Sequence, residues 1–343
     1  MADQEVATRA PESDAQASPA PTGSPDEPGP VMSEHCTTDR PTRMSIHLIR
    51  HLHPQLTVTQ PTARLLEENF GNLVYLTKPE SYPSSPSKLL LLLTGGTGLK
   101  STNNQIQADK FASEGYVVVM PDLFDGDPAP NSAALPESET LVSSFLDAFK
   151  LKAAETAKSF LIDMWLARHT EEKVLPILEK VINACESEFA DAVGYGGGIY
   201  AVGYCFGGRY VLLLASERTV SQTSWTGAQK QPDEEAGEGQ GPTKKGPSIK
   251  AGALAHATLV SPDDFKGLKS PVSLVCVESD PMFPDEVRTA GEDAMSKGNL
   301  EHEVQVYPGV PHGFAVVGDY ADTNIKGAQV TAYEQMLKWL NEH

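Results

Sequence analysis

From residue 72 onward, short apolar runs alternate with segments of helical periodicity. The apolar runs predict strands at Asn72–Thr77, Lys88–Leu93, Tyr116–Met120, Ala251–Val260, Val272–Val277 and His302–Tyr307, and a further strand beginning at Ile199. Helical periodicity predicts helices at Asn103–Glu114, Arg209–Ala215, Asp285–Lys297 and Lys326–Glu342, and two or three more within Glu137–Ala190. Strands that alternate with helices predict an α/β fold with a mostly parallel, doubly wound sheet and helices on both faces.

Three segments fall outside this alternation. Residues 1–31 are acidic and rich in Pro, Ala and Ser, which predicts a disordered tail. Residues 32–71 form an N-terminal extension without a clear pattern; its histidines, His47, His51 and His53, have no carboxylate nearby and suit solvated surface better than a metal site. Residues 216–250 are rich in Gly, Glu, Gln and Lys, and predict a long loop insertion in a domain that spans 72–343.

The charge balance narrows the possible partners. The 343 residues carry a formal net charge of −19, which argues against nucleic acid or an anionic membrane surface as a partner. No apolar run approaches the roughly 20 residues of a membrane-spanning helix, and no secretory signal is visible. The cysteines, of which there are 4, show no metal-binding spacing. We therefore expect a cytoplasmic protein, monomeric or homodimeric, with reduced thiols.

The most informative motif follows the strand that begins at Ile199. Gly203-Tyr204-Cys205-Phe206-Gly207 has the G-x-C-x-G pattern of a nucleophile elbow with Cys in place of Ser. A sharp strand-to-helix turn strains the central residue and crowds its flanking chains, so glycine is needed two residues before and two after it. Cys205 could instead be a buried core cysteine. The strand before it and the apolar helix after it favour a nucleophile whose helix amides stabilise an oxyanion.

Two later strands end in residues that can complete such a site. Asp280 follows Val272–Val277, and His312 follows His302–Tyr307. The order Cys205, Asp280, His312 is the nucleophile, acid and base order of an α/β-hydrolase. We expect His312 to take the thiol proton or to hold the thiolate as an ion pair, and Asp280 to orient the imidazole. Glu278 is a second candidate acid, two residues before Asp280, and is a candidate pocket residue.

The combination of motifs resembles the dienelactone hydrolase family, particularly its fungal branch. The resemblance rests on Gly203–Gly208, Pro121–Phe124, Glu278–Asp280 and Tyr307–Phe314, and extends roughly over Asn72–His343. It implies an α/β-hydrolase fold, a Cys-His-Asp triad at Cys205, His312 and Asp280, and hydrolysis of a small-molecule ester or lactone through an acyl-enzyme. It also implies that neither a metal nor an organic cofactor is used.

The resemblance extends to the surroundings of the triad, with one departure. His256 resembles a histidine of the fungal branch and is expected near the pocket, in a functional or a structural role. The family usually has an acidic residue in the loop after its second main strand, where this chain has Gly95. The loop backbone could still supply one oxyanion N–H, from Gly96, and Phe206 the other. The apolar surroundings of Val316 suggest a substrate with little charge.

Two other functional classes have some support. Thr94–Gly98 resembles a dinucleotide-binding glycine loop, which would suggest an NAD-dependent oxidoreductase. That motif needs a third glycine as the helix begins, and Lys100 and Ser101 stand there instead. Alternatively, the chain could be a binding protein that kept a hydrolase fold but lost catalysis, an idea motivated by Gly95.

Overall fold

The structure is a computed structural model that describes residues 38–39, 62–130, 160–220 and 243–343. The predicted tail at 1–31, the three histidines of the extension and the central part of the insertion lie outside the described residues. In the described part of the chain, no helix is long and apolar enough to cross a membrane.

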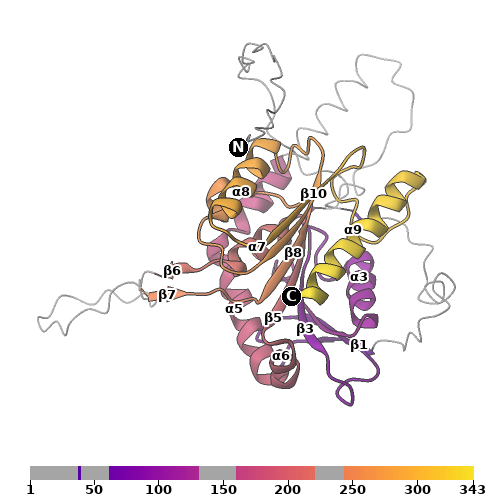
Figure 1. Ribbon diagram of the computed structural model, residues 1–343. Helices are drawn as coiled ribbons and strands as arrows, with labels where there is room; N and C mark the ends of the chain where they lie inside the picture. The colour runs from indigo at the N-terminus through magenta and orange to yellow at the C-terminus, as the bar shows by residue number, and fades with distance from the viewer. Residues whose placement is uncertain (1–37, 40–61, 131–159, 221–242) are drawn as a thin grey trace, which may run out of the picture. The chain divides into compact units, whose positions relative to one another are not determined.

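One eight-stranded sheet organises the described chain, in the order β1-β2-β4-β3-β5-β8-β9-β10 (Figure 1). Every neighbouring pair from β4 to β10 is parallel, while β2 is antiparallel to both β1 and β4. The strands are β1 (Thr62–Leu66), β2 (Val74–Lys78), β3 (Lys88–Leu93), β4 (Tyr116–Pro121), β5 (Ile199–Tyr204), β8 (Ala251–Ala255), β9 (Val272–Val277) and β10 (His302–Tyr307). The predicted mostly parallel α/β sheet is confirmed.

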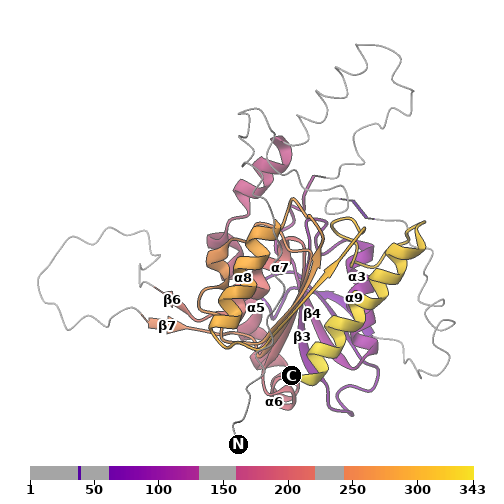
Figure 2. The ribbon, with the colours of Figure 1, turned by 45° about the horizontal axis from the view of Figure 1, so that its top comes forward.

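Helices cover both faces of this sheet, as Figures 1 and 2 show. Helices α3 (Thr102–Ser113) and α9 (Thr323–Glu342) lie on one face, and α5 (Glu171–Glu188), α6 (Ala190–Gly196), α7 (Phe206–Ala215) and α8 (Asp285–Lys297) lie on the other. Residues 160–168 are also helical. Two apolar clusters result, one on each face, because the central strands are buried on both sides.

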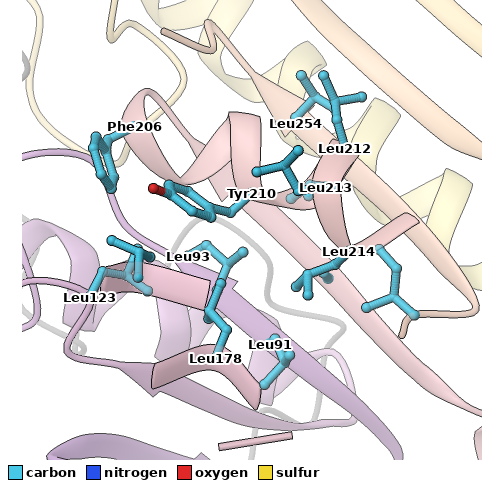
Figure 3. Close-up of a cluster of buried hydrophobic side chains, with 14 of the residues drawn as sticks. Leu91, Leu93, Leu123, Leu178, Phe206, Tyr210, Leu212, Leu213, Leu214 and Leu254 are labelled. Atoms are coloured by element: carbon cyan, nitrogen blue, oxygen red, sulfur yellow. The ribbon is translucent and has the colours of Figure 1, made fainter. Parts of the chain in front are cut away.

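The helix after Cys205 anchors one of these clusters. All but one of the residues of α7 are buried; its side chains face Leu91 and Leu93 of the sheet and Leu178 of α5 (Figure 3). Burying a leucine side chain contributes about 1.5–3 kcal/mol. The segment that carries the candidate nucleophile is therefore held rigidly between the sheet and α5.

Several predicted boundaries differ from the structure. Helix α7 begins at Phe206 rather than Arg209, because the turn at Cys205 leads directly into it. The strand predicted over Ala251–Val260 ends at Ala255, where His256 takes a positive φ of 38° that a strand cannot accommodate. Strand β1 lies in the extension to which the sequence assigned no structure.

The ends of the insertion are ordered parts of the domain. A short antiparallel pair, β6 (Arg218–Val220) and β7 (Thr243–Lys245), closes its base. Ser216 before the pair and Ile249 after it are buried, and the Ser248 amide donates to the Leu214 carbonyl of α7. The loop prediction for 216–250 thus does not hold at its two ends.

Candidate active site

Cys205 occupies a strained turn between β5 and α7. Its φ of 50° and ψ of −116° lie in a region that non-glycine residues rarely adopt. A Cβ on Gly203 would lie 2.5 Å from the carbonyl oxygen of Gly207, and a Cβ on Gly207 would lie 2.2 Å from that of Leu93. Both distances are too short for any side chain, so the two glycines allow the turn.

The backbone amides of this turn are almost all occupied. The N–H groups of Cys205, Gly207 and Gly208 donate to the carbonyls of Ala255, Thr94 and Cys205, at 3.0–3.1 Å. Phe206 is the first residue of α7, so its N–H has no acceptor within the helix. It is therefore the amide of the turn that is available to an oxygen bound in front of Cys205. Gly96, the second predicted oxyanion donor, is buried in the adjacent loop after β3.

The predicted acid and base meet in the structure. Asp280 follows β9 and His312 follows β10, and the two strands are parallel neighbours. Nδ1 of His312 lies 2.6 Å from Oδ2 of Asp280, and both side chains are buried. The second Asp280 oxygen accepts from the Met282 N–H at 2.9 Å, which fixes the carboxylate.

The imidazole of His312 also faces the thiol. Because Nδ1 is engaged by Asp280, Nε2 is the atom left for Cys205. Burial alone would lower the pKa of His312, but the hydrogen bonds and charges of Asp280 and Cys205 outweigh it and raise the pKa to about 9. Cys205 contributes both a hydrogen bond and a charge to this shift, so its thiol lies within reach of the imidazole.

A cavity opens in front of Cys205. It encloses about 330 Å³, including open solvent, and is lined by Thr38, Asp39, Gly95, Thr97, Asn103, Asn104, Cys205, His256, Gly313 and Val316. Cys205 thus forms one wall of an open hollow between the loop after β3, helix α3 and the loop after β10.

The other predicted residues take different places around this cavity. His256 lies at the end of β8, is fully buried, and its ring centroid is 5.0 Å from that of His312. Glu278 is exposed and is not among the cavity residues. A Cβ on Gly95 would lie 3.1 Å from the Cβ and 3.7 Å from Sγ of Cys205. The glycine therefore brings its backbone directly against the nucleophile.

Sequence reasoning missed one wall of the cavity. In helix α3, the apolar Ile106 is only half-buried, whereas the polar Asn103, Asn104 and Gln107 are buried. Asn104 donates to Oγ1 of Thr97 at 3.0 Å and to the Gly98 carbonyl at 2.8 Å, which ties α3 to the loop after β3. Nothing in the periodicity of the helix distinguishes these amides from solvent-exposed ones.

The described residues hold no group of three or more His, Cys, Asp or Glu side chains arranged for a metal ion. In the described part of the chain, Cys185, Cys205 and Cys276 form no disulfide. Burial raises the pKa of Cys185 and of Cys276 to about 12, so neither is a nucleophile at neutral pH.

Comparison with known proteins identifies the family of this chain. The profile of the dienelactone hydrolase family matches residues 74–244 and 240–343, and the chain belongs to that family. Hydrolase pyvD of Aspergillus violaceofuscus is 28% identical over 275 residues, covering 80% of this chain and 88% of the relative. Dienlactone hydrolase 1 of Gibberella moniliformis is 24% identical over 280 residues, covering 80% and 88%.

Solved structures share the fold. A dienelactone hydrolase-like promiscuous phosphotriesterase from metagenomic libraries aligns with a TM-score of 0.51 at 15% identity, covering 82% of this chain and 98% of its own. An esterase of the Planctomycetes species Thermogutta terrifontis aligns with a TM-score of 0.50 at 14% identity, covering 84% and 96%. The α/β-hydrolase fold expected from the motifs is confirmed, and the chain is a dienelactone hydrolase-like hydrolase.

Proposed function

We propose that the protein hydrolyses a small carboxylic ester or lactone, with Cys205 as nucleophile, His312 as base and acid, and Asp280 as the residue that orients His312. The observation that carries this proposal is the buried His312–Asp280 pair, with 2.6 Å between Nδ1 and Oδ2, at the rim of the sheet where Cys205 occupies its strained turn. These three groups supply the parts that acyl transfer requires.

The first half-reaction forms an acyl-thioester. Because the pKa of His312 is raised, the proton of the Cys205 thiol resides on Nε2 before the substrate binds, and the thiolate attacks the carbonyl carbon of the substrate. The amides of Phe206 and Gly96 stabilise the oxyanion of the tetrahedral intermediate. As this intermediate collapses, the bond to the leaving oxygen breaks and His312 returns the proton to that oxygen.

The second half-reaction uses water. His312 removes a proton from a water molecule, whose oxygen attacks the thioester carbonyl. Collapse releases the carboxylic acid and regenerates the cysteine. A lactone would remain attached through its acyl end until this step, so its ring opens to a hydroxy acid without loss of a fragment.

Asp280 has two tasks in this scheme. Its hydrogen bond to Nδ1 selects the tautomer whose Nε2 faces the thiol. Its charge stabilises the imidazolium that forms when Cys205 loses its proton, in keeping with the raised pKa of His312. Because Gly95 carries no carboxylate that could activate the thiol, this pair is the source of activation in the proposed site.

Hydrolysis of p-nitrophenyl acetate by the wild type and by the C205A and H312A variants tests the proposal. We expect kcat/KM to fall at least about 10³-fold in C205A, in line with the loss of a triad member. The C185A variant is a matched control, because it removes a buried thiol of α5 that does not line the cavity. Equal turnover in wild type and C205A would reject catalysis by Cys205. If both rates also equal the uncatalysed rate, a binding protein with a hydrolase fold would be the better interpretation.

A further inference from the structure

The walls of the cavity in front of Cys205 carry negative charge. Among the described residues that line it, Asp39 is the only carboxylate, and there is no Lys or Arg. Carboxylic side chains are ionised at neutral pH. A substrate that carries its own carboxylate would therefore meet a like charge in this cavity and no Lys or Arg among the described residues of its walls.

Asp39 is held firmly in this position. One oxygen of its carboxylate accepts from Oγ of Ser101, and the other accepts from the Thr102 N–H at 2.9 Å. Ser101 is the N-cap of α3, and its Oγ also accepts from the Asn104 N–H at 3.2 Å. The carboxylate is thus fixed by two donors at the N-terminus of the helix that forms the polar wall.

Asp39 comes from outside the part of the chain that matches the family, which begins at residue 74. The extension therefore contributes Thr38 and Asp39 to a cavity whose other lining residues all lie within the family domain. The family match therefore does not determine which substrates can bind beside Thr38 and Asp39.

We propose that Asp39 is a specificity-determining residue whose carboxylate selects neutral esters and lactones over substrates that carry a carboxylate. The inference rests on the proposed function, because it takes Cys205 as the reacting atom. Two like charges about 8 Å apart reduce binding by between about twofold and about thirtyfold, depending on the local dielectric constant. Removing the charge would also leave the positive end of the α3 dipole without a carboxylate, which acts in the same direction.

The charge preference can be measured without turnover. Iodoacetamide is neutral and iodoacetate is an anion, and both alkylate thiolates. The rate of modification of Cys205 by each reagent, followed by peptide mass spectrometry, gives a neutral-to-anion rate ratio. D39N removes the charge but keeps an acceptor for Ser101, D39E keeps the charge, and D293N removes an exposed carboxylate of α8 that pairs with Lys297.

We expect the rate ratio to fall between about twofold and about thirtyfold in D39N, and to stay at the wild-type value in D39E and D293N. Salt at about 1 M should lower the wild-type ratio toward that of D39N, because the Debye length then falls to about 3 Å. A merely structural role for Asp39 would change both rates equally. An unchanged ratio in D39N, or a Cys205 that neither reagent modifies, would overturn the inference.

A second experiment, which measures ester hydrolysis, distinguishes failure of this inference from failure of the proposed function. The wild type and D39N are compared on p-nitrophenyl butyrate and on the p-nitrophenyl monoester of succinic acid, which is of similar length but carries a carboxylate. Hydrolysis that depends on Cys205, with the same ester preference in both proteins, would reject the role of Asp39 alone. The absence of hydrolysis that depends on Cys205 would reject the proposed function, and the alkylation ratio would still decide the role of Asp39.

Discussion

Replacing Asp280 by Asn should convert the reactive thiol into an ordinary one. The Asn side chain has nearly the same shape as Asp and can still accept from the Met282 N–H, but it removes the charge that faces Nδ1 of His312. Cys205 is then the remaining group that opposes the effect of burial, so the pKa of His312 should fall well below about 9.

The size of the effect follows from the protonation of His312. A pKa of about 9 keeps the imidazole ~99% protonated at pH 7, where it can stabilise a thiolate. In D280N the imidazole is mostly neutral at pH 7, and an ordinary thiol with a pKa of about 8.5 is only ~3% thiolate at that pH. Because only the thiolate is alkylated, we expect the rate of Cys205 modification at pH 7 to fall about 30-fold.

The difference in alkylation rate between wild type and D280N should depend on pH. The imidazolium is present below a pH of about 9 and is lost above it, so the advantage of the wild type is confined to lower pH. Above pH 9.5 an ordinary thiol is also largely ionised, and the rates of the two proteins should converge to within a few-fold.

The assay is iodoacetamide modification of Cys205 from pH 5.5 to 10, followed by peptide mass spectrometry, with circular dichroism to verify folding. Nuclear magnetic resonance of the His312 ring gives the imidazole pKa directly. If D280N reacts at pH 7 within threefold of the wild type, Asp280 does not support the charge on His312, and the reasoning is wrong.

Two further variants test the turn that presents Cys205. G207A places a Cβ 2.2 Å from the Leu93 carbonyl oxygen and should destabilise the protein by about 1–3 kcal/mol or more. G327A is the control, because it lies at an exposed position of α9 with nothing within 4 Å, and it should stabilise the protein by about 0.5–1 kcal/mol. Denaturant unfolding measures both changes in stability, and equal effects would contradict the packing described. G95A places a methyl group 3.7 Å from Sγ of Cys205, so we expect kcat/KM for p-nitrophenyl acetate to fall at least about tenfold, by loss of the space a carbonyl needs, with an unfolding free energy within about 1 kcal/mol of wild type. Full activity in G95A would show that substrate does not approach across this loop.

The sequence predicts the fold well at positions where the backbone geometry allows only one type of residue. The motif around Cys205 predicts its turn because Gly203 and Gly207 are required sterically, and the structure shows both contacts. Asp280 and His312 could be paired because each follows a strand, and parallel neighbouring strands end at one rim. The remaining strand boundaries follow the apolar runs, with the exception of β8.

The polar wall of the cavity could not be predicted in this way. Asn103 and Asn104 are buried because they bind a loop and line a cavity, and a helical pattern read from the sequence places such residues toward solvent. Asp39 stands more than 60 residues before Ser101 and Thr102, and its role depends on a contact across that separation. The end of β8 was missed because Ala257, Leu259 and Val260 are apolar, although His256 and Leu259 both take positive φ values.

The central claim is that Cys205 carries the acyl group during turnover. Rapid acid quenching of the wild type during hydrolysis of p-nitrophenyl acetate, followed by peptide mass spectrometry, tests this directly, because a thioester survives in acid. The account predicts one acetyl group on the peptide that contains Cys205, sensitive to hydroxylamine and absent from C205A. Steady hydrolysis with the acetyl group on another residue, or undiminished hydrolysis by C205A, would contradict it.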